Sequence, residues 1–462
     1  MLYALLRSVA GVALRWFYRR IDVEGLEQLP RNVPLIIVVN HPNALVDALL
    51  VGWAMPRRVV LTAKATLFEN AMLGRLLTWI GVVPLVRRSD ASATPGGSKL
   101  DPRRNVPAFG ALRAVLRRCG AVVIFPEGIS HDNPSLAPLR TGAARIALEA
   151  RDEGHVRGLH IVPVGLTFER KDAPRTRVFV QVGSSIELDR WRAAGESAVA
   201  SLTEEIDARL RAVTLNFTSV DDATRAATLS SVFAAFLQKE PDSIGTARPL
   251  RVEVSLARRI EEARRALVRG TNDALRVRVD ALLSDLATFE DRLSRHEVSL
   301  DDVRISPASR HAAPFVLREA WIIALGGPVA LWGAVNHWLP FHAARLIARR
   351  SVESAADPAM RTIVAGAVLV LAFYAVQGTL VAVLAGWVAA LSYVVSLPLA
   401  ADVNFLLRER LSRVIRRART YLLFRRRPKL HAQLQRELHR LQFEAVEIER
   451  LLRGTDRSEA TA

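Results

Sequence analysis

The sequence predicts an α/β domain, followed by a helical region and by C-terminal membrane helices. Between residues 21 and 189, short β-branched apolar runs alternate with amphipathic stretches, as strands alternate with helices around a buried sheet. Residues 191–303 carry few turn signals and many acidic–basic pairs at helical spacing, and long uncharged stretches follow them. We therefore divide the chain into five parts: 1–29, an amphipathic membrane-interface helix; 30–190, the α/β domain; 191–313, a helical region; 314–407, a membrane region; and 408–462, a basic cytoplasmic tail.

The first twenty residues predict an amphipathic helix that lies in a membrane interface. Apolar residues recur at helical spacing from Leu2 to Phe17, and four arginines lie between or after them: Arg7, Arg15, Arg19 and Arg20. The alternative is a cleaved signal peptide, which carries its positive charge ahead of the apolar core. The position of the arginines favours the interfacial helix.

The α/β domain contains six apolar runs that we interpret as strands. They span residues 35–39, 59–62, 81–86, 122–125, 161–166 and 178–182. A stretch rich in Ser, Thr, Pro, Gly and charge, residues 89–107, predicts a loop.

Composition restricts the class of partner. Half of the 462 residues are apolar, so membrane segments are expected, and the formal net charge of +18 implies an anionic partner. Nucleic acid is disfavoured because acids interleave with the bases in residues 191–303 and aromatic residues are scarce there. We interpret that region as a helical spacer or a regulatory subdomain. Cys119 is the only cysteine, which excludes an intrachain disulfide and fits a reducing compartment.

Two apolar stretches define the membrane region. Residues 321–339 are interrupted by Gly326-Gly327-Pro328, whereas residues 363–401 are nearly uncharged over about twice the length that one crossing needs. Arginines between the stretches and after the second should be cytoplasmic by the positive-inside rule. We therefore expect a broken, re-entrant or interfacial helix, then a hairpin that turns near Gly386, with both ends in the cytoplasm. Two ordinary crossings are the alternative.

The first chemical motif is Asn40-His41-Pro42-Asn43-Ala44-Leu45-Val46-Asp47, which follows the run 35–39. Pro42 is suited to the first position of a helix, so we expect Asn40 or His41 as its cap. His41 then lies before the first turn and can meet Asp47. A carboxylate that orients one imidazole nitrogen leaves the other to take a proton from an alcohol. The competing interpretation is a structural His–Asp pair.

Further polar groups follow other predicted strands and strengthen the catalytic interpretation. They are Lys64, Arg87, Arg88, Glu127, Gly128 and Arg140, the last of which precedes a predicted helix start at Thr141-Gly142. An arginine beside a helix N-terminus can bind an anion, although each basic residue taken alone is also compatible with a solvated surface charge. The histidine His131 can reach the same place or cap a turn.

Four blocks in this region resemble the glycerolipid acyltransferases, the superfamily of glycerol-3-phosphate and lysophosphatidate acyltransferases. The blocks run from Asn40 to Asp47, from Gly81 to Arg87, from Phe125 to Gly128, and from Ile161 to Gly165. The resemblance implies an α/β fold, an acyl-CoA or acyl-carrier-protein donor, and phospholipid synthesis at the cytoplasmic face of a membrane. It also implies His41 as the base and Asp47 as its orienter.

Two departures from the commonest family pattern point to one branch. Five residues separate His41 from Asp47 where four are commoner, and the third block continues Ile129-Ser130-His131-Asp132 where Thr-Arg-Ser is commoner. Both features resemble the fungal-type glycerol-3-phosphate and dihydroxyacetone-phosphate acyltransferases, as does the downstream segment Leu136-Ala137-Pro138-Leu139. This favours glycerol-3-phosphate or dihydroxyacetone phosphate as the acceptor over lysophosphatidate.

We expect an O-acyltransferase in which His41 and Asp47 are catalytic and backbone donors near the helix start stabilise the oxyanion. Its expected substrate-binding residues are Asn43, Lys64, Arg87, Arg88, Glu127, Gly128, Ser130, His131, Arg140 and Pro163. Its partners are the acyl donor, the phosphoglycerol acceptor and anionic membrane lipid, and the mechanism requires no metal or organic cofactor. The alternative from another class is a non-catalytic lipid-binding membrane scaffold, for which the amphipathic start, the hairpin and the basic tail would suffice.

Overall fold

The computed structural model describes residues 2–86, 106–171, 173–193, 197–237, 249–269, 273–305, 312–350 and 358–459. The chain forms two compact units, one of Met1–Asn216 with Ile347–Ala365 and one of Phe217–Leu346 with Gly366–Ala462. We describe each unit separately.

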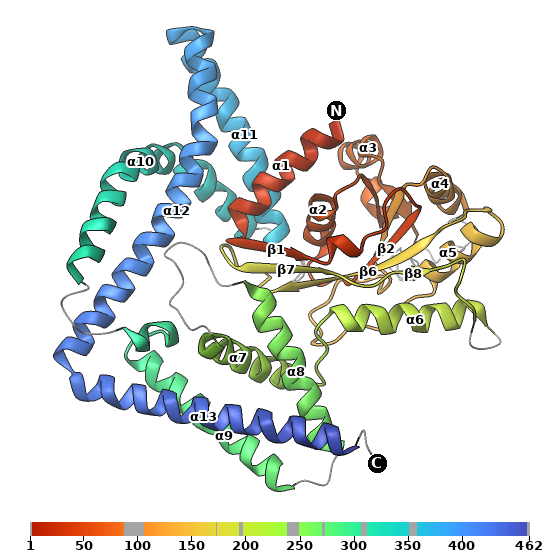
Figure 1. Ribbon diagram of the computed structural model, residues 1–462. Coiled ribbons are helices and arrows are strands. Elements are labelled where there is room, and N and C mark those ends of the chain that lie inside the picture. The colour runs from red at the N-terminus through yellow and green to blue at the C-terminus, as the bar shows by residue number, and fades with distance from the viewer. Residues whose placement is uncertain are drawn as a thin grey trace. The chain divides into compact units, whose positions relative to one another are not determined.

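An eight-stranded mixed sheet forms the centre of the first unit, in the order β1-β7-β6-β2-β5-β3-β4, with β8 paired to β6 (Figure 1). The strands are β1 Arg20–Glu24, β2 Leu35–Val39, β3 Val59–Lys64, β4 Val83–Leu85, β5 Ala121–Ile124, β6 His160–Phe168, β7 Arg177–Val182 and β8 Ile186–Glu187. The central strand β2 is parallel to both neighbours, β5 and β6, and β3 is parallel to β5 and β4. The six predicted strands are confirmed, whereas β1 and β8 were not predicted.

Helices cover both faces of this sheet. They are α1 Leu2–Phe17, α2 Ala44–Ala54, α3 Ala71–Ile80, α4 Val106–Arg117, α5 Gly142–Asp152 and α6 Ala198–Val213, with short 3-10 turns η1 Leu26–Gln28 and η2 Ala65–Phe68. Alternate residues of β2 point to opposite faces: Ile37 packs with α1 and α2, and Ile36 packs with α4, α5 and α6. This explains why β2 is apolar at every position.

Helix α6 corrects one predicted boundary. We expected the α/β domain to end at residue 190, but Leu202 and Ile206 of α6 are buried in the core on one face of the sheet. The unit therefore continues to Asn216.

The predicted N-terminal helix is present as α1, and one side of it packs against α2. Leu14 is fully buried, and the Arg7 guanidinium donates to the Trp53 carbonyl oxygen at 2.9 Å. Leu5 is 61% exposed. The helix thus has one apolar side inside the domain and further apolar surface outside it.

The second unit contains a helical core formed by α7 Val220–Leu237, α8 Leu250–Arg269, α9 Asp273–Arg295, η5 Leu300–Arg304 and α13 Pro428–Glu459. Helices α9 and α13 run antiparallel, and ion pairs such as Arg278–Glu444 at 3.1 Å and Arg440–Asp285 at 2.6 Å join them. The segment that we expected to be a basic tail, 408–462, therefore includes a helix packed into this core. The predicted helical character of residues 191–303 is confirmed for the described part of that range, which forms α6 to α9.

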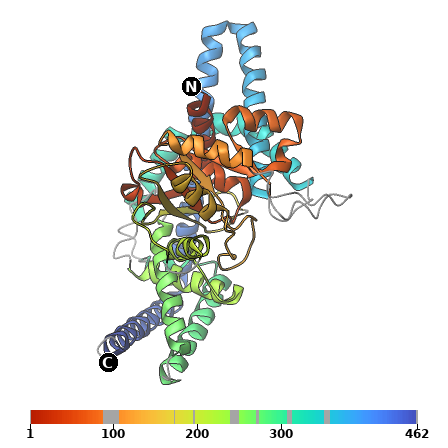
Figure 2. The ribbon, with the colours of Figure 1, turned by 90° about the vertical axis from the view of Figure 1, so that its right-hand side faces the viewer.

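Three helices in the described part of the chain are long and apolar enough to cross a membrane: α10 Ala312–Arg350, α11 Pro358–Ala385 and α12 Trp387–Arg426. Helix α10 is continuous through Gly326-Gly327-Pro328, so of the expected broken, re-entrant or interfacial forms the broken one is wrong. Helices α11 and α12 meet at Gly386, which has φ +84°, and form a hairpin (Figure 2). The turn lies where the sequence predicted it.

Helix α10 is continuous but strongly bent. Its first half runs antiparallel to α12, because Glu319 pairs with Arg410 at 2.9 Å and Trp332 donates to Ser396 at 3.2 Å. Its second half runs antiparallel to α11, because His337 bonds Tyr374 at 2.6 Å and Ala344 approaches Gly366. Since α11 and α12 are themselves antiparallel, a straight helix cannot make both sets of contacts. Helix α10 forms an arch (Figure 1), and it contains Pro328 and Pro340, residues that commonly bend helices.

Candidate active site

The candidate site lies at one edge of the sheet. Because β2, β5 and β3 are parallel, their carboxyl ends lie at the same edge. His41 follows β2, Glu127 follows β5, and Lys64 ends β3. Ligands of open α/β sheets bind at the carboxyl ends of the strands. The sheet therefore gathers the first and third sequence blocks in one place.

His41 and Asp47 form the expected pair. Nδ1 of His41 lies 2.9 Å from Oδ2 of Asp47, and the same oxygen accepts the N–H of Asn43 at 2.8 Å. Helix α2 begins at Ala44 with Asn43 as its cap, which corrects the expected start at Pro42. Asp47 reaches back to the capping residue's amide, much as the glutamate of a capping box does. One carboxylate thus fixes the helix start and the imidazole together.

The surroundings of this pair favour a base at the other imidazole nitrogen. Asp47 is fully buried, and burial raises the pKa of its carboxyl, while the hydrogen bond and charge of His41, the Asn43 amide and the Lys171 charge oppose that rise. The His41 ring stacks on Phe125 with ring centres 4.1 Å apart. With the Nδ1 proton directed to Asp47, Nε2 carries the lone pair that accepts a proton.

Glu127 ties the loops of the site together. Its Oε1 accepts the His41 amide at 2.8 Å, and its Oε2 accepts the Ala137 amide at 2.8 Å and contacts Nε2 of His131. Nδ1 of His131 accepts the Asn133 amide, so Nε2 carries the proton that is donated to Glu127. Both residues, which we expected to bind substrate, are engaged within the protein.

Asn43 and Ser130 are also engaged within the protein. The Asn43 side-chain amide donates to the Tyr18 hydroxyl at 3.3 Å and to the Lys171 carbonyl at 3.0 Å. Ser130 Oγ accepts the Ala44 amide at 3.0 Å. The amides of Asn43 and Ala44 are therefore occupied and do not serve as donors for an oxyanion.

The predicted basic residues differ in position. Arg140 is exposed, and its side chain passes beside Gly128, which has φ +73° in the turn after β5. Lys64 lies at the carboxyl end of β3. Arg87 and Arg88 lie outside the described residues. Arg140 and Lys64 are thus the described cations from the predicted set.

Pro163 does not reach the site edge. It is buried within β6 and pairs with Val38, three positions before His41. Its carbonyl oxygen accepts the Gly183 amide at 2.9 Å. Its position indicates a role in the sheet rather than contact with substrate.

Sequence reasoning missed three residues that hold the His41 loop. Asn40 bonds both the amide and the carbonyl of Leu166, at 2.7 and 3.0 Å. Nζ of Lys171 donates to the Pro42 carbonyl at 3.1 Å and pairs with Asp132. Tyr18 accepts from Asn43. Asn40 is the first residue of the motif, and the sequence suggested it only as a helix cap. The other two residues come from distant parts of the chain and carry no local signal.

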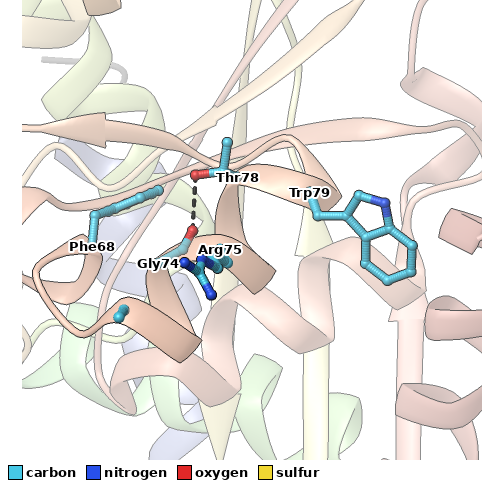
Figure 3. Close-up of a pocket in the computed structure, with 6 residues that line it drawn as sticks. Phe68, Gly74, Arg75, Thr78 and Trp79 are labelled. Carbon is cyan, nitrogen blue, oxygen red and sulfur yellow. Dashed lines mark hydrogen bonds between the residues drawn. The ribbon is translucent and has the colours of Figure 1, made fainter.

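A shallow pocket lies elsewhere on the first unit, between η2 and α3 (Figure 3). Its lining residues are Phe68, Ala71, Gly74, Arg75, Thr78 and Trp79. Thr78 donates to the Gly74 carbonyl at 2.8 Å, and the Trp79 ring points away from these two residues. None of the site residues His41, Asp47 and Glu127 lines this pocket.

Comparison with known proteins finds similarity between the first unit and acyltransferases. The family model described as Acyltransferase matches residues 20–167. Glycerol-3-phosphate O-acyltransferase 2 of Saccharomyces cerevisiae is 32% identical over 33% of this chain and 20% of its own length. The 1-acyl-sn-glycerol-3-phosphate acyltransferase of Cocos nucifera is 30% identical over 40% of this chain and 55% of its own length.

A solved structure, the 1-acyl-sn-glycerophosphate acyltransferase PlsC from Thermotoga maritima, aligns with TM-score 0.35 and 18% identity over 46% of this chain and 78% of its own. The chain thus spans between a fifth and about half of the length of the two curated relatives above. Residues 20–167 are thus similar to acyltransferases, and the relatives named above include both a glycerol-3-phosphate and a 1-acylglycerol-3-phosphate acyltransferase.

Proposed function

We propose that this protein transfers a fatty acyl group from an acyl-CoA or acyl-carrier-protein thioester to a hydroxyl of a phosphoglycerol acceptor in phospholipid synthesis. The observation that carries the proposal is the 2.9 Å contact between His41 Nδ1 and buried Asp47 at the carboxyl edge of the sheet. A hydroxyl acceptor needs a base, and this pair supplies one without an enzyme nucleophile.

His41 and Asp47 account for each proton that moves in this reaction. Nε2 of His41 takes the hydroxyl proton as the acceptor oxygen attacks the thioester carbonyl carbon. The tetrahedral intermediate collapses, the C–S bond breaks, and His41 returns the proton to the departing thiolate. Asp47 holds the Nδ1 proton throughout and stabilises the imidazolium that forms between the two proton transfers.

The proposed acceptor is glycerol-3-phosphate or dihydroxyacetone phosphate. The continuation Ser130-His131-Asp132 and the five-residue spacing between His41 and Asp47 support this choice, as does the likeness to the yeast glycerol-3-phosphate enzyme. Lysophosphatidate is the second candidate because the Cocos nucifera relative is named for that acceptor. Exposed Arg140, beside the Gly128 turn, is suited to the acceptor phosphate.

We propose a membrane enzyme whose catalytic domain works on the cytoplasmic face. The hairpin of α11 and α12 has the length and apolar composition of a membrane insertion. The arch of α10 brings its two ends back toward the same end of that hairpin, which fits a re-entrant segment. The basic residues after residue 408 favour anionic lipid on the cytoplasmic side.

One experiment separates the candidate functions. Purified protein receives labelled acyl-CoA with glycerol-3-phosphate, dihydroxyacetone phosphate or lysophosphatidate, and the labelled lipid product is quantified. We expect transfer to one of the first two, and loss of at least about a hundredfold in His41→Ala at unchanged folding and vesicle binding. Transfer only to lysophosphatidate selects the second candidate. Absence of transfer to every acceptor, with vesicle binding retained, favours the non-catalytic scaffold.

A further inference from the structure

The loop of five residues between His41 and Asp47 contains an unusual backbone conformation. Ala44 has φ +45°, in the left-handed region that residues with a Cβ atom rarely occupy. It is the first residue of α2, directly after the cap Asn43. The left-handed residue allows the longer loop to close while Asp47 still reaches both His41 and the Asn43 amide.

A side chain from the third sequence block holds that residue. Ser130 Oγ accepts the Ala44 amide at 3.0 Å, and Glu127 Oε1 accepts the His41 amide at 2.8 Å. The two acceptors are three residues apart in one loop, and the two amides are three residues apart in the other. The loop after β5 therefore holds the loop after β2 at two points, on either side of Pro42-Asn43.

We propose that Ser130 is a positioning residue: by fixing left-handed Ala44, its hydroxyl keeps the five-residue loop closed and Asp47 against His41. The inference rests on the proposed acyl transfer and assigns Ser130 a role other than the substrate contact expected from the sequence. It also joins the two blocks that depart from the commonest family pattern, because Ala44 of the first block donates a hydrogen bond to Ser130 of the third.

The test compares Ser130→Ala and Ser130→Thr with a matched control, Ser185→Ala. The control removes a serine hydroxyl of the same domain that contacts His160 at the amino end of β6. We expect Ser130→Ala to lower kcat about tenfold while KM for donor and acceptor changes less than about twofold. Threonine supplies the same acceptor oxygen, so Ser130→Thr should restore kcat to within about threefold of the wild type. The control should match the wild type.

A second readout does not depend on activity. Hydrogen exchange followed by mass spectrometry should show faster exchange in the peptide containing Ala44 to Asp47 in Ser130→Ala, and wild-type exchange in Ser130→Thr and Ser185→Ala. A raised acceptor KM at unchanged kcat would instead identify a substrate contact and overturn the proposal, as would unchanged exchange in Ser130→Ala. If the wild type transfers no acyl group, the proposed function fails, while exchange still decides whether Ser130 holds this loop.

Discussion

At the residue scale, Asp47 combines a catalytic requirement with a cost in stability. Its carboxylate is fully buried and orients His41. Burial raises the pKa of this carboxyl above the ordinary value of 3.8. Protonation of Asp47 therefore favours the folded state, and this contribution is fully present below pH 3.8. The contribution is lost as the pH rises through the raised folded-state pKa. Above that raised pKa, the ionised carboxylate lowers the stability of the fold.

Asp47→Asn should separate the two effects. The neutral amide avoids the cost of burying a charge, and its oxygen can still accept from His41 Nδ1 and from the Asn43 amide, but it carries no full charge to stabilise the imidazolium. We expect kcat to fall by at least about a hundredfold, because proton transfer to a well-matched base contributes about 10²- to 10⁴-fold. The midpoint of thermal unfolding at pH 7 should be unchanged or higher. Retained activity together with a lower midpoint would contradict this account of Asp47.

The residues of the site show what a sequence can reveal. His41, Asp47 and Glu127 were predictable because their types and spacing are local and chemically specific. The start of α2 was not, because Pro42 suited a first helical position while Asp47 recruits the Asn43 amide and moves the start to Ala44. Lys171 bonds the Pro42 carbonyl across 129 positions, and no local pattern encodes such a contact.

At the element scale, the bend of α10 depends on a close approach to α12. A Cβ atom at Gly333 would lie 2.2 Å from the Ala400 carbonyl oxygen, so only glycine permits this contact. Hydrogen bonds from Trp332 to Ser396 and from Tyr393 to Asn336 flank the contact. Sequence patterns predicted an interruption of this apolar stretch but not its form, because a bend inside a continuous helix is decided by the packing partner.

Gly333→Ala should therefore loosen α10 from α12, and Gly326→Ala provides the matched control. A Cβ atom at Gly326 would make only ordinary contacts with Leu407, at 3.8 and 3.9 Å, so alanine there should stabilise the helix by about 0.5–1 kcal/mol. Alanine at 333 should destabilise by about 1–3 kcal/mol through overpacking. Thermal unfolding in detergent, with limited proteolysis of α10, measures both. Equal effects of the two substitutions would show that the Gly333 contact does not hold the arch.

At the scale of the whole molecule, the arch of α10 makes a prediction about membrane sidedness. If α10 enters and leaves from one side, the catalytic domain, Arg345 and the basic C-terminal part of α12 all lie on the same side of the bilayer. If α10 crosses instead, Arg345 lies opposite the catalytic domain. Exposed Cys119, the only cysteine in the sequence, is a built-in marker for the side of the catalytic domain.

Labelling with a membrane-impermeant maleimide decides between these arrangements. The wild type reports the side of Cys119, and in a Cys119→Ser background Arg345→Cys and Ser412→Cys report the other two positions, both exposed in the structure. In sealed vesicles of one orientation we expect all three cysteines to label together, and in the inverted preparation all three to be protected. The Cys119→Ser protein alone gives the background. Labelling of Arg345→Cys from the opposite side would indicate that α10 crosses. Because that variant lacks the guanidinium charge, Leu346→Cys, which keeps Arg345, should then give the same result.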